Sequence, residues 1–537
     1  MATIDAVIVG LYFLTVMLIG FYFAHHKKDT PTAYFLADRN LGWFVLGISL
    51  FATNISSEHF VGLAGYGAGR GLAVGNIEWL AIPFLMLLGR FFAPIFLKAG
   101  IFTVPEFFGR RFNTASRMYL SGISIISYLL TKISVSLFAG GVLLKALLGW
   151  DMYTSAVLMV VITGIYTIVG GMRAVVFTSL LQGIMLIVGA VLLTALGLWE
   201  VGGISGLQAA LPESHFSIFK PVTDPDFPWT GILFGAPILA IWYWCTDQYI
   251  VQRVLCARDA AAAREGTLFT GFLKILPMFI LVVPGLIAAV LYPGIQGDDA
   301  YASLLTGSLL PVGVKGIVLV GVLAALMSSL SGCFISASTL FTMDFYRYFR
   351  PNAPDKKLVL VGQLATTFTV GVAILWIPLI RSVNSHLYVY LQSLQAFISP
   401  PIAAVFFLGL FWKRLNGRGA IVALIGGGLI GGLRLFLEWM GRFHPPGSPL
   451  LRWLIEMNFL HFAALLFCLS ALLLILGSFS APVARSPKVE PYTLPWKGYF
   501  PLRPTLDTSS ASQSGRATRV FSVALLLVLI GLWGIFF

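Results

Sequence analysis

Charged residues are scarce in this sequence. Asp, Glu, Lys and Arg together make up 11% of the 537 residues, whereas a soluble globular domain contains about 25%. Hydrophobic residues make up 58%, and the mean hydropathy is +0.89. This composition excludes a soluble globular domain and indicates an all-α polytopic membrane protein, because a chain that spans lipid must satisfy its backbone groups internally.

Cysteine and the usual catalytic motifs are also rare or absent. Of the four cysteines, three lie in apolar runs and Cys256 lies in a basic loop, so we expect no disulfide framework. The sequence has no GxxxxGK[ST] loop for ATP, no GxSxG elbow and no metal-ligand spacing of histidines. We therefore expect neither an ATP-driven pump nor an enzyme, and no catalytic residues.

Apolar runs long enough to cross a bilayer recur along the whole chain. Each needs about 17 to 25 residues, and we count about fourteen of them. The predicted spans are Ala6–Phe23, Phe44–Arg70, Val74–Lys98, Tyr119–Leu148, Met152–Val169, Ala174–Trp199, Thr230–Val254, Thr267–Tyr292, Pro311–Tyr346, Leu358–Ile380, His386–Trp412, Ala420–Trp439, Trp453–Leu476 and Thr518–Phe537.

The net charge of +13 follows the topology of these spans. If both termini lie outside, the basic residues fall in the cytoplasmic loops, as the positive-inside rule requires. The inside set is Lys27, Lys28, Arg110, Arg111, Arg253, Arg258, Lys356, Lys357, Lys413 and Arg414, and the outer loops carry Glu213, Asp224, Asp226, Asp298 and Asp299. We therefore expect a cell-membrane protein and no nucleic-acid partner; the sequence leaves the oligomeric state open.

Two spans are interrupted by polar residues, at "TNISSEH" in the second and at "WYWCTDQ" in the seventh. Broken helices at matching positions are typical of transporters built from inverted repeats. The predicted organisation is a first span and loop (1–43), a first repeat of five helices (44–200), an outer loop (201–228), a second repeat (229–415), two accessory helices (416–478), a cytoplasmic linker (479–517) and a last helix (518–537).

Three ionisable side chains inside the predicted spans are candidates for a binding site. Glu78 and Lys274 either pair structurally or offer charge-assisted hydrogen bonds to a hydroxylated ligand. His59 lies beside the first interruption. In the ninth span, Ser328 and Ser329 are adjacent, so they face different neighbours; such hydroxyls either join helices or supply oxygen ligands to a small cation.

Six stretches resemble the sodium/solute symporter family, and within it the sodium–glucose cotransporter branch. They are "NISSEHFVGLAGYGA", "GIFTVPEFFGRRF", "WYWCTDQYIVQR", "LKILPMFILVVPG", "LMSSLSGCFISASTLFTMDFYR" and "QSLQAFISPPIAAVF". The resemblance implies a LeuT-type fold of five plus five inverted helices. It also implies a sugar site formed by Asn54, His59, Glu78, Lys274 and Gln392, with the aromatic residues Tyr243, Trp244 and Tyr388.

The same resemblance implies a sodium site made by the carbonyls of Ala52, Ile55 and Ala325 and the hydroxyls of Ser328 and Ser329. Some sugar cotransporters hold a second sodium with an Asp in the sixth span. Here Ser179 takes that place and Gly332 replaces a nearby hydroxyl, so we predict one sodium per sugar. Tyr66 and Arg70 stand where small residues are usual, which leaves the preferred sugar open.

These observations predict a symporter that couples sodium to a hexose of the glucose or galactose type by alternating access, with sodium as the coupling ion. A symporter for myo-inositol or another small solute is the first alternative. A sugar-gated sensor or channel is the second, and a membrane enzyme is the least favoured.

Overall fold

A computed structural model of the chain describes residues 2–25, 29–149, 151–295, 297–376, 387–441, 448–480 and 511–536. In these ranges the regular secondary structure is helical, and pairing of extended backbone is limited to two isolated bridges, Leu41 with Ala257 and Lys220 with Pro228. The predicted all-α class is confirmed. Lys27, Lys28 and most of the predicted linker 479–517 lie outside the described residues.

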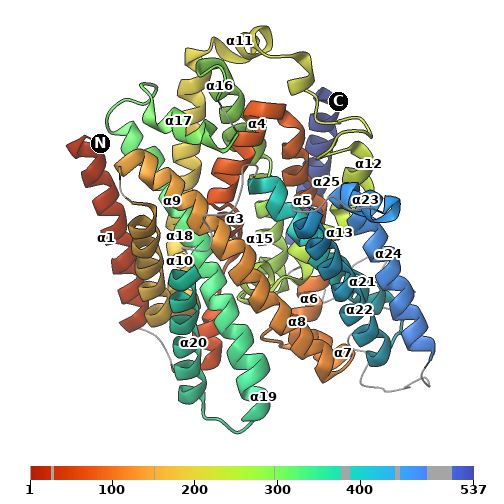
Figure 1. Cartoon of the computed structure of the whole chain (residues 1–537). Coiled ribbons are helices and arrows are strands. Elements are labelled where there is room, and N and C mark those ends of the chain that lie inside the picture. Colours follow the sequence, from red (N-terminus) through yellow and green to blue (C-terminus); the bar gives the residue numbers. More distant parts are fainter. Residues whose placement is uncertain are drawn as a thin grey trace.

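The first part of the chain, through the first predicted repeat, contains ten α-helices (Figure 1). They are α1 (Thr3–His25), α2 (Pro31–Leu36), α3 (Trp43–Asn54), α4 (Ala64–Arg70), α5 (Gly75–Leu87), α6 (Ala93–Ala99), α7 (Val104–Arg111), α8 (Thr114–Ser127), α9 (Ser134–Leu148) and α10 (Met152–Glu200).

The second part continues with an outer segment, the second predicted repeat and the accessory helices. These are α11 (Gly203–Ala210), α12 (Trp229–Phe234), α13 (Ala236–Ala240), α14 (Gln248–Leu255), α15 (Ala260–Leu273), α16 (Val283–Leu291), α17 (Ala300–Thr306), α18 (Val314–Leu340), α19 (Arg347–Phe349), α20 (Asp355–Trp376), α21 (Leu387–Phe411), α22 (Gly417–Gly441), α23 (Pro449–Glu456), α24 (Phe459–Phe479) and α25 (Ala511–Ile535).

Short tighter or wider helical turns interrupt or extend several of these helices. The π-helical turns are His59–Leu63, Leu88–Phe92, Tyr128–Ile133, Ile241–Thr246, Met278–Val282 and Phe341–Tyr346, and the 3₁₀ segments are Ala37–Arg39, Leu72–Val74, Glu213–His215 and Gly297–Asp299. Single π-helical turns inside α-helices are frequent at functional sites. Three of these π-helical turns carry site residues described below.

Twelve helices in the described ranges are long and apolar enough to cross a membrane. One of them, α10, is two helices joined at Gly171, which has φ +60° and ψ −156°. That positive φ favours glycine and produces a kink between the two helices. The fourteen predicted ranges correspond to these twelve helices when α10 is counted as two helices and the broken pair α3 and α4 is added as one more span.

Two predicted boundaries are wrong because capping side chains set them elsewhere. The thirteenth span does not begin at Trp453, which lies in the separate helix α23; Asn458 begins α24 by accepting a hydrogen bond from the Leu460 amide at 2.9 Å. The eighth span begins at Ala260 instead of Thr267, since Asp259 caps the Ala262 amide at 2.7 Å. Such caps satisfy the free amides of a first helical turn.

The core of the molecule lies around α18. In an apolar 18-residue window of this span, 94% of the window is buried inside the protein. The corresponding share is 17% in α1 and in α25, which lie at the periphery. Figure 1 shows α10 and α18 side by side in the bundle, and the two chain ends point toward the same end of it. The sides of the membrane assigned to the termini stay a prediction.

Candidate functional site

The second predicted span is broken where the sequence becomes polar. Helix α3 ends at Asn54, and Ile55 is extended with φ −78° and ψ 115° before the π-helical turn begins at His59. The hydroxyl of Ser329 on α18 donates to the freed carbonyls of Thr53 at 3.2 Å and Ile55 at 3.4 Å. The predicted interruption is confirmed, and irregular backbone of this kind is tolerated in a membrane where it is buried in protein or lines a cavity.

The seventh predicted span is broken at Asp247, within the predicted motif. This residue is extended, with φ −71° and ψ 122°, between the π-helical turn Ile241–Thr246 and α14. Its carboxylate accepts from the Tyr249 amide at 3.1 Å and from the Tyr128 hydroxyl, and lies 3.3 Å from Lys132 Nζ. The second interruption is therefore also confirmed, and it carries an ion pair that holds it to the first half of the chain.

The candidate sugar residues gather beside the first break. Lys274 Nζ donates to a carboxylate oxygen of Glu78 and, at 2.7 Å, to Asn54 Oδ1; Asn54 Nδ2 donates to the Tyr243 hydroxyl at 3.0 Å. The side chains of Lys274 and Glu78 are 1% and 4% exposed. These bonds matter because a buried ion pair is stable only when its remaining hydrogen bonds are satisfied. Together the four residues join four separate helical segments.

The other oxygen of Glu78 faces α21 and the first break. Tyr388 donates its hydroxyl hydrogen to Glu78 Oε1 at 3.0 Å, and His59 Nε2 lies 3.4 Å from the same atom. The Ser56 amide donates to His59 Nδ1 at 3.2 Å. An acceptor at Nδ1 means that the neutral ring carries its hydrogen on Nε2, which then points toward Glu78.

The remaining candidate sugar residues surround this network. The Trp244 ring lies 5.4 Å from Lys274 Nζ and packs edge-to-face on Tyr243 with centroids 5.1 Å apart. Gln392 lies one turn beyond Tyr388 on α21 and is partly buried. The structure thus brings Asn54, His59, Glu78, Lys274, Tyr243, Trp244 and Tyr388 into one buried cluster, with Gln392 at its edge.

The candidate sodium residues lie where α3 meets α18, and they divide into two groups. Ser329 faces the break, and Ala325, one turn earlier on α18, and Ala52, in the last turn of α3, are fully buried. Ser328 instead shares a hydrogen bond of 2.9 Å with Ser179 on α10. Carbonyl and hydroxyl oxygens are ligands of hard cations, and these oxygens therefore suit a small monovalent ion.

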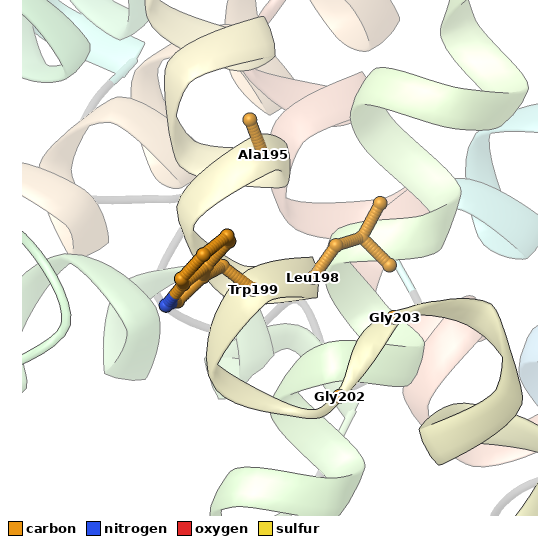
Figure 2. A pocket seen from close by; sticks show the side chains of 5 residues that line it. All are labelled: Ala195, Leu198, Trp199, Gly202 and Gly203. Carbon is orange, nitrogen blue, oxygen red and sulfur yellow. The ribbon is translucent and has the colours of Figure 1, made fainter.

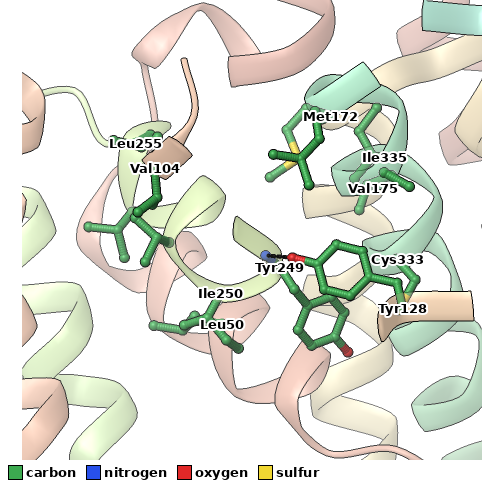
Figure 3. Packing of buried hydrophobic residues seen from close by; sticks show 14 of the residues in the cluster. Leu50, Val104, Tyr128, Met172, Val175, Tyr249, Ile250, Leu255, Cys333 and Ile335 are labelled. Carbon is green, nitrogen blue, oxygen red and sulfur yellow. Dashed lines mark hydrogen bonds between the residues drawn. The ribbon is translucent and has the colours of Figure 1, made fainter. Parts of the chain in front are cut away.

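Sequence reasoning missed Lys132, Tyr249 and the role of Asp247. Lys132 Nζ lies 4.1 Å from the Tyr243 ring centroid and 3.9 Å from that of Tyr249, while Tyr249 donates its hydroxyl hydrogen to the Thr53 carbonyl. Figure 3 shows Tyr249 beside Tyr128, whose hydroxyl accepts from the Tyr249 amide at 3.0 Å. The available signal was a lysine in the middle of the apolar run "ISYLLTKISVSLF".

A separate pocket of about 490 Å³ lies at the end of α10 and is lined by Ala195, Leu198, Trp199, Gly202 and Gly203. Figure 2 shows the Trp199 ring projecting away from the helix, and this side chain is 87% exposed. The lining residues include no charged group. Exposed tryptophan is typical of the membrane–water interface, and none of the lining residues belongs to the polar cluster.

Comparison with known sequences places the chain among sodium symporters. The model of the sodium:solute symporter family matches residues 34–427. Sodium/glucose cotransporter 1 of Oryctolagus cuniculus is 38% identical over 539 residues, which cover 92% of this chain and 81% of that protein. Sodium/myo-inositol cotransporter of Homo sapiens is 37% identical over 533 residues, which cover 89% and 74%.

Solved structures agree on the fold. A Na⁺-coupled sialic acid symporter, described in its substrate-bound outward-open state, has a TM-score of 0.76 at 22% identity, over 90% of this chain and 99% of that one. Mhp1, a nucleobase-cation-symport-1 family transporter, has a TM-score of 0.54 at 14% identity, over 86% and 98%. The expected LeuT-type architecture is confirmed. The matching family and relatives are transporters and not enzymes. The expected multi-pass plasma-membrane location is also confirmed. With its two helix breaks and buried polar cluster, the chain belongs to the sodium:solute symporter family.

Proposed function

We propose that this protein is a sodium-coupled symporter that imports a hexose of the glucose or galactose type by alternating access, with one sodium ion per sugar. The observation that supports it most is the hydrogen-bonded chain from Lys274 through Asn54 to Tyr243, whose middle member lies at the first helix break. The sodium/glucose cotransporters that are 38% identical over most of the chain support the same substrate class.

The sugar would bind by exchanging hydrogen bonds within the polar cluster. Glu78 accepts and Lys274 donates, so a hydroxyl placed between them receives charge-assisted bonds, each worth about 1.5–3 kcal/mol. His59 and Gln392 add neutral donors and acceptors, and Tyr388 covers the opposite side. Tyr243 and Trp244 offer aromatic surfaces below the pyranose ring. An anionic substrate is disfavoured, because Glu78 would repel it.

Sodium would bind at the first break, to the carbonyls of Ala52, Ile55 and Ala325 and the hydroxyls of Ser328 and Ser329. Ion binding at Ile55 would order the backbone next to Asn54, which already contacts both Lys274 and Tyr243. The coupling must be reciprocal, so sugar also raises sodium affinity. A membrane potential adds about 2.3 kcal/mol per charge per 100 mV to the driving force.

The single-ion stoichiometry is supported by the surroundings of Ser328. Its neighbour at the expected acidic position is Ser179, a neutral hydroxyl 2.9 Å away. A Cβ at Gly332 would lie 2.8 Å from Nη2 of Arg253, which is fully buried in α14 and does not lie in a cytoplasmic loop as the sequence predicted. A nearby guanidinium, with a serine in place of a carboxylate at position 179, disfavours a second cation.

A myo-inositol symporter is the second candidate, because the sodium/myo-inositol cotransporters are 37% identical over 89% of the chain. A cyclic polyol presents hydroxyls to the same donors and acceptors but lacks the ring oxygen. Uptake by proteoliposomes separates the two candidates: labelled glucose is accumulated in a sodium gradient, and unlabelled galactose competes better than myo-inositol.

The same assay tests the coupling. We expect no accumulation when choline replaces sodium, and a charge-to-sugar ratio near one. A ratio near two would contradict the single-ion proposal, whereas sugar binding without accumulation would contradict the symporter proposal itself.

A further inference from the structure

Three arginines from separate segments lie around the first two turns of α15, within electrostatic range of Arg264. Arg264 lies in the second turn of α15, Arg519 lies near the start of the apolar span of α25, and Arg90 lies in the π-helical turn after α5. A Cβ at Gly89 would lie 3.2 Å from the Arg264 Cα. The rings of Phe272 on α15 and Phe521 on α25 have centroids 6.3 Å apart. The packing therefore places the segment of Arg90 and the helix of Arg519 against α15, which carries Arg264.

The positive charges of this arginine cluster (Arg90, Arg264 and Arg519) outnumber the two carboxylates that attract Arg264 within the described residues. Both Arg90 and Arg519 repel the charge of Arg264, and Nε of Arg264 is buried without a hydrogen-bond partner. Asp259 and Glu265 attract it, but Asp259 already caps α15 and lies 3.5 Å from Arg258. Neighbouring like charges are unfavourable unless an anion joins them, and the partial burial of Arg264 adds to the cost.

The arginine cluster lies at the level where the membrane spans start. The spans Ala260–Leu291 and Ala517–Ile535 begin within a few residues of Arg264 and Arg519. Arg90 and Arg519 are exposed, and just beyond Arg519 the helix presents Val520, Phe521 and Val523, which are 65%, 55% and 56% exposed. An anion with an apolar tail can therefore reach the arginines from the bilayer while its tail covers α25.

We propose that the arginine cluster binds the phosphate of an anionic phospholipid headgroup on the predicted cytoplasmic side. Guanidinium groups form paired hydrogen bonds with phosphate oxygens, and basic pockets between membrane helices on this side hold anionic headgroups. Free phosphate shares this chemistry, but the exposed apolar face of α25 beside the cluster fits acyl chains and therefore favours the lipid.

The test is a titration of the purified full-length protein in detergent with dioleoyl-phosphatidylglycerol, dioleoyl-phosphatidylcholine or inorganic phosphate. The rise in apparent unfolding temperature gives the half-saturating concentration. Of the three ligands, we expect only phosphatidylglycerol to raise the apparent unfolding temperature. Each arginine near a membrane surface contributes about fivefold in affinity, so the triple variant Arg90→Gln/Arg264→Gln/Arg519→Gln should need at least about tenfold more lipid.

The matched control removes equal charge elsewhere, through Arg350→Gln/Lys356→Gln/Lys357→Gln at exposed positions just after α19 and in the first turn of α20, and should leave the lipid response unchanged. If the control variant needs as much additional lipid as the triple variant, the proposal is overturned, because the lipid is then attracted by the overall positive charge and not by this cluster. Stabilisation by inorganic phosphate in place of lipid would overturn it in favour of a soluble-anion site. If the triple variant does not fold, Arg519→Gln alone decides, since an unchanged half-saturating concentration contradicts the proposal.

Discussion

At the scale of single residues, the Lys274–Glu78 ion pair is the feature that most limits what the site can do. Both groups are almost fully buried, and their neighbours Asn54 and Tyr388 complete their hydrogen bonds. The sequence left open whether the two charges pair with each other or bind a ligand. The structure pairs them directly, and a hydroxylated substrate can still enter the pair because a hydroxyl donates to Glu78 and accepts from Lys274.

Removing one partner of this pair should damage stability as well as transport. We expect Glu78→Gln to lower the free energy of unfolding by about 3–5 kcal/mol, because it leaves the Lys274 ammonium buried without its counter-charge. The double variant Glu78→Gln/Lys274→Met should regain most of that stability but remain inactive. Thermal unfolding and sodium-dependent glucose uptake measure the two effects; uptake by the double variant would contradict the assignment.

Ser329 should affect the ion more than the sugar. Its hydroxyl faces the freed carbonyls of the first break, and the loss of one oxygen ligand corresponds to about 1 kcal/mol. We therefore expect Ser329→Ala to raise the sodium half-saturation constant about fivefold, with a smaller change in glucose KM at saturating sodium. Ser338→Ala is the control, since among the described residues this hydroxyl donates to the Ile335 carbonyl of its own helix alone. Unchanged sodium activation would refute the ligand role.

At the scale of elements, the two broken helices are linked through the π-helical turn Tyr128–Ile133. Lys132 from this turn pairs with Asp247 at the second break and contacts the rings of Tyr243 and Tyr249. Tyr249 in turn holds the Thr53 carbonyl at the first break. One lysine therefore connects the expected sugar platform to the backbone beside the expected ion, although the two belong to different helices.

Lys132 should accordingly matter for turnover. A cation–π contact is worth about 0.5–2 kcal/mol, and Lys132→Met also leaves Asp247 without its cation. We expect kcat for sugar uptake to fall at least about tenfold. Lys145→Met, at an exposed position of α9, supplies the comparison. If the two variants transport alike, Lys132 has a packing role only.

Helix α18, which carries both serines, is anchored by the first helix. Asp5 Oδ1 accepts the amides of Gly313 at 2.8 Å and Gly316 at 2.9 Å, which are free donors at the start of α18. A carboxylate at a helix N-terminus contributes about 1–2 kcal/mol. We expect Asp5→Ala to lower the apparent unfolding temperature without changing sugar KM, and Asp5→Asn to restore much of the loss. A stability equal to that of the parent protein would argue against the cap.

At the scale of the whole molecule, the last helix reaches the neighbourhood of the substrate site from outside the two repeats. Trp533 Nε1 donates to Asn76 Oδ1 at 3.1 Å, two residues before Glu78. Phe536 packs on Trp79, with ring centroids 6.0 Å apart, and Trp79 donates to the Ile275 carbonyl at 3.2 Å, next to Lys274. Helix α25 therefore supports both members of the ion pair from behind.

Trp533→Phe should test this support, because it removes the N–H donor and keeps an aromatic ring. We expect sugar KM to rise about three- to tenfold, the worth of one buried hydrogen bond, with the sodium half-saturation constant unchanged. Trp199→Phe, at an 87% exposed position, is the matched control. Equal shifts in sugar and sodium constants would indicate a general loss of structure instead.

The sequence alone determined the helical class, the two interruptions and the polar candidates, because lipid penalises every unsatisfied polar group and so makes each one conspicuous. Helix ends were less certain, since short caps such as Asp259 and Asn458 move them by several residues. Only the tertiary structure decided which polar groups meet: that Glu78 pairs with Lys274, that Ser328 turns to Ser179, and that Lys132 joins the two breaks. Such contacts join residues far apart in the chain, and their distances depend on packing that no local pattern encodes.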